Sequence, residues 1–275
     1  MIQDIAPKQY HVEFAVKEPQ EDSLCFVFRG QEVLERLEGD RLLLPTCREL
    51  REGAEEIRYA FRIDGTDYFL AWLREGFLPA GYDWRSIRFD RDKRTKELTF
   101  AGATARHMDL WYKDNRFCGR CGTKTVHDDK ERMVRCPKCG NLIYPKICPA
   151  VIVAVTDGDR ILMSRYQNRA YKGYGLIAGF VEIGEKAEET VSREVMEEVG
   201  LKVKNIRYYG SQPWGIVGNI SLGYFCELDG DDKIYLDGQE LAQADWYRRG
   251  EVELAPDDYS LTNDMIQAFL RGDWN

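Results

Sequence analysis

The segment from residue 179 to residue 201 constrains the fold more than any other part of the chain. On a helix with 3.6 residues per turn, Glu194, Glu197 and Glu198 stand at i, i+3 and i+4 and share one face. An adjacent apolar stripe follows the spacing i, i+4, i+8: Val191, Val195 and Val199. Because Gly200 is a typical helix terminator, the pattern predicts a helix over residues 185–199 that docks its valines on a core.

The acidic face of this helix indicates a site for divalent cations. Carboxylates that crowd beside a core repel one another at neutral pH unless cations compensate them. Mg²⁺ does so with oxygen ligands, and it completes its shell with water and phosphate oxygens. Arg193 is expected to hold one carboxylate in a bidentate pair, and Gly179 and Gly184 would permit a loop close to a ligand. Taken alone, three glutamates at this spacing are more typical of a solvated helix face.

The cysteines indicate a second metal site. The chain has eight cysteines, and four of them form two Cys-x2-Cys pairs separated by fourteen residues: Cys118, Cys121, Cys136 and Cys139. Four thiolates at this spacing complete a tetrahedral zinc shell with no open position, which makes the predicted site structural. Two redox dithiols are the alternative, but no βαβ pattern surrounds the pairs. His107 and His127 lie nearby and are expected to be surface residues and not ligands.

Composition excludes several classes of function. The chain has 39 basic and 47 acidic residues and a net charge of −8, so it is not expected to coat nucleic acid through counterion release. No apolar run approaches the roughly 20 residues of a membrane span, and no signal peptide is visible. We therefore expect a cytoplasmic protein without a membrane partner.

The pattern of apolar runs, turn signals and cysteines changes along the chain and predicts three domains, at residues 1–113, 114–146 and 147–275. In the first we expect a strand at 24–28, a hairpin of 57–63 with 68–73 and a helix at 98–112. This domain shows no catalytic constellation, so a scaffold or dimerisation role is expected. The second domain holds the cysteine pairs. The other elements expected in the third are a hairpin of 150–155 with 161–166, strands at 206–210, 220–228 and 241–247, and a closing helix at 261–270. Strands mixed with two helices indicate an α/β or α+β layered domain.

The complete pattern around the acidic helix is highly specific. It reads Gly, five residues, Glu, seven residues, then Arg-Glu-apolar-x-Glu-Glu-x-Gly-apolar, and a chance match at a given start is on the order of 10⁻⁸ from average residue usage. Every position is filled: Gly179, Glu185, Arg193, Glu194, Val195, Glu197, Glu198, Gly200 and Leu201. The segment resembles the box of the Nudix hydrolases.

Within that superfamily the chain is similar to the NAD(H) pyrophosphatase (NudC-like) branch. A four-cysteine ribbon precedes the box, the tetrapeptide Ser211-Gln212-Pro213-Trp214 follows it, and Tyr144-Pro145 and Gly179-Phe180 also match. The resemblance implies a Nudix α/β/α sandwich with a mixed sheet, preceded by a zinc ribbon and an N-terminal α+β domain.

The resemblance also implies an activity, namely metal-dependent hydrolysis of the pyrophosphate of NADH or NAD⁺ to NMN(H) and AMP. Some members of the branch remove NAD caps from RNA 5′ ends. The implied catalytic residues are Arg193, Glu194, Glu197 and Glu198, and the three glutamates and Glu240 would bind Mg²⁺ or Mn²⁺. The implied substrate contacts are Tyr144, Phe180, Trp214, Gln212 and Glu240. Phe180 and Tyr144 would sandwich a base, with Tyr144 supplied by the second subunit of a homodimer.

One loop departs from the branch. The branch continues after Trp214 with Pro-Phe-Pro-x-Ser, whereas this chain has Gly215-Ile216-Val217-Gly218-Asn219. A flexible aliphatic loop thus replaces a proline-stiffened aromatic one, which leaves the second nucleoside moiety open. A Nudix pyrophosphatase acting on ADP-ribose or another nucleoside diphosphate derivative is one alternative. A non-enzymatic nucleotide-sensing module and RNA binding by the ribbon are the others.

Overall fold

A computed structural model describes residues 1–88, 90–167, 173–236, 238, 240–252 and 259–274. The chain divides into two compact units. The C-terminal unit comprises Met1, Ile147–Pro213 and Asn219–Asn275, and the N-terminal unit comprises Ile2–Lys146 and Trp214–Gly218. The ribbon segment and the loop after β15 therefore group with the N-terminal unit. The three separate domains stay a prediction.

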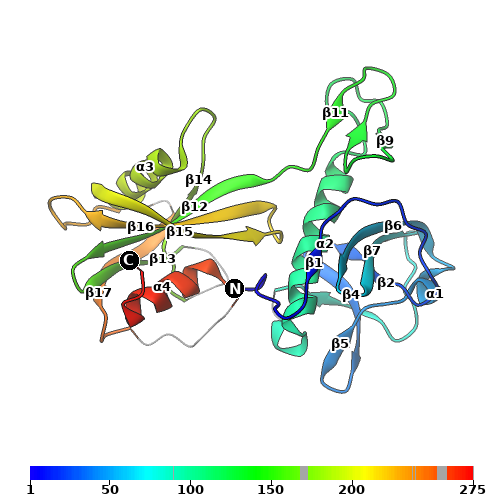
Figure 1. Cartoon of the computed structure of the whole chain (residues 1–275), viewed down its shortest axis with the longest axis horizontal. Helices are drawn as coiled ribbons and strands as arrows, with labels where there is room; N and C mark the ends of the chain where they lie inside the picture. The colour runs from blue at the N-terminus through cyan, green and yellow to red at the C-terminus, as the bar shows by residue number, and fades with distance from the viewer. Residues whose placement is uncertain (89, 168–172, 237, 239, 253–258, 275) are drawn as a thin grey trace. The chain divides into compact units, whose positions relative to one another are not determined.

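The C-terminal unit is built on a mixed sheet (Figure 1). Its strands are β12 (Cys148–Asp157), β13 (Arg160–Tyr166), β14 (Ile177–Phe180), β15 (Val203–Trp214), β16 (Asn219–Leu228) and β17 (Leu241–Arg248). The order is β15-β16-β12-β13-β17, and β14 also pairs with β12. Strand β12 runs parallel to β16 and antiparallel to β13 and β14, so it is the central strand.

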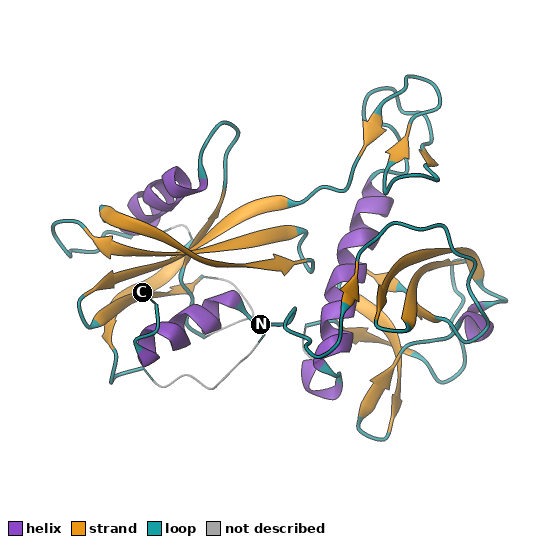
Figure 2. Ribbon diagram, in the orientation of Figure 1, coloured by secondary structure: helices purple, strands orange, loops and turns teal. Residues whose placement is uncertain are grey.

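Two helices cover opposite faces of this sheet, α3 (Ala187–Val199) and α4 (Leu261–Arg271) (Figure 2). Because side chains alternate along a strand, Val151 and Val153 of β12 pack with the valine stripe of α3, while Ala154 packs with Phe269 of α4. Burial of the α3 valines is complete, with no side chain of the three exposed to solvent. The predicted α/β/α sandwich is confirmed.

The helix boundaries follow local chemistry. Helix α3 ends at Gly200, whose φ of 71° is left-handed, as the sequence predicts. It begins at Ala187, two residues later than expected, because Glu185 lies in a turn that its amide closes by donating to the Glu182 carbonyl. Helix α4 begins after Ser260, whose hydroxyl accepts from the Asn263 amide, and ends at Gly272.

Ahead of the ribbon, the N-terminal unit carries two small sheets and a long helix. Its elements are β1 (Tyr10–His11), β2 (Leu24–Phe26), β3 (Phe28–Arg29), β4 (Glu32–Glu38), β5 (Arg41–Leu43), α1 (Cys47–Leu50), β6 (Ala54–Ile63), β7 (Thr66–Leu73), β8 (Asp83–Ser86), a 3₁₀ turn (Arg91–Lys93) and α2 (Lys96–Asp114). The sheets have the orders β1-β6-β7-β2 and β3-β4-β5, and β8 pairs with β4. The hairpin and the helix predicted here are confirmed, and the predicted strand at 24–28 is split into β2 and β3.

The ribbon is a three-stranded antiparallel sheet of short strands. They are β9 (Val126–His127), β10 (Val134–Arg135) and β11 (Leu142–Ile143), in the order β11-β10-β9. None of the helices in the described ranges combines the length and the apolar character that crossing a membrane requires.

Candidate active site and metal centre

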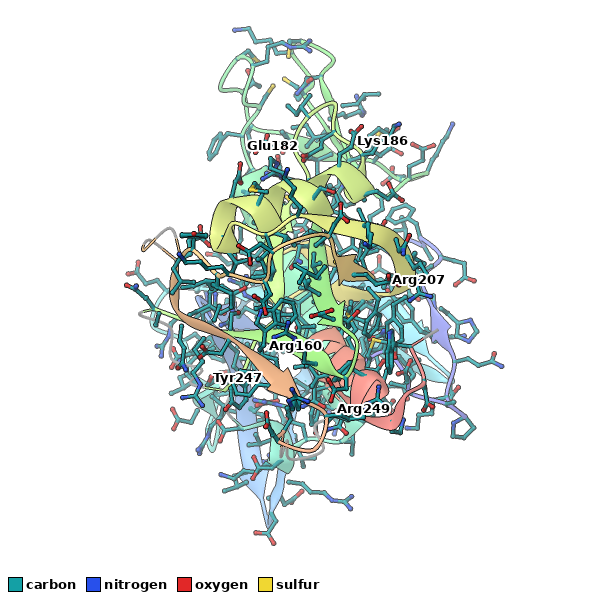
Figure 3. The ribbon with its side chains drawn as sticks, turned by 90° about the vertical axis from the view of Figure 1, so that its left-hand side faces the viewer. Arg160, Glu182, Lys186, Arg207, Tyr247 and Arg249 are labelled. Carbon is teal, nitrogen blue, oxygen red and sulfur yellow. The ribbon has the colours of Figure 1, made fainter. Side chains whose placement is uncertain are left out.

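Arg193 is the centre of the contacts around the acidic helix. Its Nε and Nη2 donate to the two carboxylate oxygens of Glu185 at 2.8 and 2.9 Å, which is the bidentate pair that the sequence predicts. Nη2 also donates to the Phe180 carbonyl at 3.0 Å. Arg193 thereby fastens α3 to the end of β14 and to the loop between them, the loop on which Figure 3 labels Glu182 and Lys186.

The remaining guanidinium nitrogen of Arg193 reaches the acidic face. Nη1 donates to Glu194 at 2.8 Å and to Glu197 at 3.0 Å. The Glu194 carboxylate is largely buried, whereas that of Glu197 is 59% exposed. Arg193 therefore fixes the position of one inward carboxylate and one outward carboxylate on the same helix.

The electrostatics separate the two glutamates that Arg193 binds most tightly. Arg193, assisted by hydrogen bonds from Thr190 and from the Glu182 amide, lowers the pKa of Glu185 to about 2. Burial raises the pKa of Glu194 despite its contact with Arg193, and the charges of Glu197 and Glu240 add to this rise. Glu185 is thus ionised at neutral pH and anchors the arginine, while Glu194 is affected by the charges of neighbouring carboxylates.

Gly179 has a steric role that differs from the predicted one. The sequence suggests a glycine loop, and Gly184 indeed has a left-handed φ of 88°, but Gly179 lies within β14 and pairs with Val151. A Cβ atom at Gly179 would lie 1.9 Å from Cδ of Glu194. Glycine is required here because the Glu194 carboxyl group occupies the space that a side chain would fill.

The other implied metal ligands differ in their burial. Glu198 is buried, with 4% of its surface exposed, and Glu240 is an exposed residue just before β17. The carboxylates are not gathered on one point, since the ribbon cysteines are the one group of three or more closely spaced ligands found among the residues described. A single Mg²⁺ usually takes only one or two protein carboxylates and fills its shell with water and phosphate oxygens, so it does not require all four glutamates to converge.

The four ribbon cysteines do converge. Their sulfur atoms all lie within 4.8 Å of one another. Each pair closes a tight turn, in which the Gly122 amide donates to the Cys118 carbonyl and the Gly140 amide to the Cys136 carbonyl. Both glycines have a φ of 71°, which other residues rarely adopt. Hydrogen bonds with Thr123 lower the pKa of Cys121 to about 6, which favours the thiolate that binds a metal.

The implied substrate residues have varied surroundings. Phe180 and Tyr144 are exposed aromatic side chains, and the Tyr144 hydroxyl donates to Glu131 at 2.8 Å. Trp214 is the last residue of β15 and is half-buried. Gln212 is buried, and its amide group binds the Tyr259 carbonyl and the Leu261 amide at the start of α4. Contact of these residues and Glu240 with a substrate stays a prediction.

The loop that departs from the branch packs on α2. A Cβ atom at Gly215 would lie 2.2 Å from the Ala103 carbonyl oxygen, and Gly218, with a φ of 79°, lies beside His107. The His107 ring in turn contacts the Lys146 carbonyl at 2.8 Å. The glycines of this loop are therefore needed for close packing as well as for flexibility.

Two of these contacts were not predicted from the sequence. The partner of Arg193 is Glu185, eight residues earlier, a spacing that does not correspond to neighbours on a helix. Glu131, which accepts from Tyr144, lies in the ribbon with no motif around it. The early start assumed for the acidic helix concealed the first contact, and no sequence signal indicated the second.

Two family models match this chain. The family model described as NUDIX domain matches residues 146–269, and that described as NADH pyrophosphatase zinc ribbon domain matches residues 113–144. Several similar relatives bear the name NAD-capped RNA hydrolase NudC, among them proteins from Mannheimia and Pseudomonas. The protein from Mannheimia succiniciproducens is 38% identical over 65% of this chain and 68% of its own length. The protein from Pseudomonas aeruginosa is 38% identical over 60% of this chain and 59% of its own length. The protein from Pseudomonas syringae pv. tomato is 35% identical over 75% of this chain and 74% of its own length.

These matches cover the ribbon, the box and the sheet that supports it. The sequence resemblance is confirmed by relatives above 30% identity that this chain covers over more than two thirds of their length. The chain belongs to the Nudix hydrolase family, in the branch that carries an NADH pyrophosphatase zinc ribbon.

Proposed function

We propose that this chain hydrolyses the pyrophosphate bond of NADH or NAD⁺ to NMN(H) and AMP with Mg²⁺ or Mn²⁺, and that it removes NAD caps from RNA 5′ ends. The observation that carries the proposal is the carboxylate array of α3 organised by Arg193. The relatives are named as hydrolases of NAD-capped RNA, and this name supports NAD and NAD-capped RNA as the substrates proposed here.

The proposed ligands of the catalytic ion are Glu194, Glu197, Glu198 and Glu240. Their fit rests on the donor chemistry, because α3 carries three of these carboxylates, the charges of Glu197 and Glu240 act on Glu194, and one arginine neutralises only part of this charge. A bound divalent ion would neutralise phosphate charge and lower the pKa of a bound water towards neutrality. Arg193 would keep the Glu194 carboxylate oriented throughout the reaction, and the carboxylates would accept protons from the attacking water.

The proposed base-binding residues are Phe180, Tyr144 and Trp214. Exposed aromatic faces bind planar bases by stacking, and they tolerate more than one base. We propose a homodimer in which Tyr144 of one subunit completes the pocket of the other. The glycine loop after Trp214 would then set how tightly the second nucleoside is held.

Product analysis tests the activity. Purified protein is incubated with Mg²⁺ and NADH, NAD⁺, ADP-ribose or a diadenosine polyphosphate, and products are separated by HPLC. We expect NMNH and AMP from NADH as the fastest reaction. Turnover of ADP-ribose far faster than NADH would contradict the proposed substrate, and no turnover of any compound would favour a nucleotide-sensing module.

Two variants assign the reaction to the box. Glu198→Gln should lower kcat by several orders of magnitude, because losing a metal ligand acts on the transition state. Glu182→Gln, which changes an exposed glutamate on the adjacent loop, should leave kcat unchanged. An assay on NAD-capped RNA beside matched triphosphate RNA then tests cap removal, and equal processing of both RNAs would contradict it.

A further inference from the structure

The N-terminal unit contains a pair of cysteines that the proposed hydrolysis does not use. The Sγ atoms of Cys25, on β2, and Cys47, the first residue of α1, lie 3.2 Å apart. Both side chains are buried, with exposed fractions of 0% and 8%. They pack with Phe69 and Leu50 in the apolar core of this unit.

The backbone holds these two cysteines side by side. The Cys25 amide donates to the Pro45 carbonyl at 2.9 Å, and the Cys47 amide donates to the Ser23 carbonyl at 2.9 Å. Between these bonds Leu24 and Thr46 form an antiparallel bridge. These backbone contacts pair the two segments next to both cysteines. The position of the two thiols side by side is therefore set by the register of the backbone.

The capping of α1 keeps Cys47 in this register. The Thr46 amide donates to the Glu49 carboxylate at 2.8 Å, and the Tyr82 hydroxyl donates to the same carboxylate at 2.8 Å. Glu49 also accepts from Arg36 at 3.1 Å. Three donors from different parts of the chain therefore hold Glu49 in the first turn that carries Cys47.

A metal site does not account for the pair. Within the ranges that the structure describes, no third cysteine, histidine or carboxylate joins these two sulfurs at the spacing seen in the ribbon. A disulfide, by contrast, has an S–S distance of about 2.05 Å, so the observed thiols would have to approach by only about 1 Å.

The two thiols differ in their accessibility. Cys47 keeps 8% of its surface exposed, whereas Cys25 has none. The hydrogen bond between the thiols lowers the pKa of Cys47 and raises that of Cys25. Cys47, the more exposed thiol, is therefore the one expected to react first, and Cys25 lies next to it to attack the oxidised sulfur.

We propose that Cys25 and Cys47 form a reversible disulfide, which makes the N-terminal unit a redox-responsive modification site. With hydrogen peroxide, the Cys47 thiolate attacks one peroxide oxygen, the O–O bond breaks, and the departing hydroxide takes a proton to become water. The Cys25 thiol then attacks the sulfenic sulfur, the S–O bond breaks, and the second oxygen leaves as water with the thiol proton. Two electrons pass from the sulfurs to the peroxide, and a dithiol reductant reverses the step.

Thiol mapping on the full-length zinc-loaded protein tests this proposal. The protein is treated with hydrogen peroxide, denatured and alkylated, and its peptides are analysed by mass spectrometry while zinc release is followed. We expect the loss of two alkylatable thiols and a linked peptide pair containing Cys25 and Cys47, restored by dithiothreitol. Separate alkylation of both cysteines, a link to another cysteine, or a link formed only after zinc release would overturn the proposal.

Variants give an independent readout. Oxidation should raise the melting temperature of the N-terminal unit in the unmodified protein, because the crosslink restricts its unfolded chain, and should not do so in Cys25→Ala or Cys47→Ala. Cys226→Ala is the matched control, since Cys226 is a buried cysteine of the C-terminal unit, and it should retain both the link and the shift. If an alanine variant does not fold, the peptide map of the unmodified protein still decides.

Discussion

At the scale of single residues, the pairing of Arg193 with Glu185 makes a prediction about acid stability. The pKa of Glu185 is lowered from 4.5 to about 2 by Arg193, so its ionised form stabilises the folded state fully above pH 4.5. This contribution is lost as the pH falls from 4.5 towards 2. The difference in free energy of unfolding between the unmodified protein and Glu185→Gln should therefore shrink over this window.

Urea unfolding between pH 3 and pH 6 measures that difference. Glu182→Gln serves as the control because its side chain is exposed on the same loop, and its small effect should not vary in the same way. A Glu185→Gln effect that stays constant with pH would show that Glu185 contributes through packing and not through its charge.

The residue scale also shows how far sequence reasoning reaches. The shared face of Glu194, Glu197 and Glu198 follows from helical geometry, and the structure places them on one helix as expected. The contact between Gly179 and Glu194 could not be predicted, because it joins a strand to a helix across fifteen residues. The structural use of Gln212 at the start of α4 likewise depends on a tertiary contact.

At the scale of elements, the contact between β14 and α3 at Gly179 and Glu194 predicts a substitution that lowers catalysis but not stability. Gly179→Ala places a methyl group where the Glu194 carboxyl group lies, and a long side chain can move away with little cost in stability. A displaced ligand, however, should lower kcat for NADH by about 10²-fold, since misplacement by about 1 Å has effects of that size.

Steady-state kinetics and thermal melting of one preparation measure the two effects. Gly210→Ala is the matched control, because it lies in β15 and its added methyl group meets open space. Unchanged kcat in Gly179→Ala would contradict the assignment of Glu194 to the catalytic centre.

The ribbon makes a second prediction at this scale. Its strands are two residues long, so it has almost no core of its own and should depend on a metal for folding. We expect about one zinc per chain by elemental analysis, and Cys136→Ser should lose both zinc and the fold of the ribbon. Cys148→Ser, outside the ribbon, should retain zinc. A stable protein purified without zinc would contradict this view.

Elements were predictable where a pattern is local. The hairpin of β12 and β13 follows from its Asp157-Gly158 turn, and α3 follows from its periodicity and its terminal glycine. Strand β14 was missed because it has only four residues, two of them Ala178 and Gly179. The parallel pairing of β12 with β16 joins residues about seventy apart, which no local pattern encodes.

At the scale of the whole molecule, the net charge of the chain predicts how strongly RNA binding depends on salt. A chain with a net charge of −8 should bind a triphosphate RNA weakly, because it gains little from counterion release. Cap removal from NAD-RNA should therefore change by less than about threefold between 50 and 200 mM salt, where RNA binders with many phosphate contacts lose orders of magnitude. NADH hydrolysis in the same buffers is the control, and a steep fall for NAD-RNA alone would indicate extended backbone binding.

The central claim is that the acidic edge of α3 holds divalent cations against a pyrophosphate. Anomalous diffraction from crystals soaked in Mn²⁺ and a nucleotide product tests it directly. We predict manganese peaks beside Glu194 and Glu198, with phosphate oxygens of the nucleotide on the same ions. Peaks and nucleotide bound elsewhere, with this edge of the helix empty, would contradict the account.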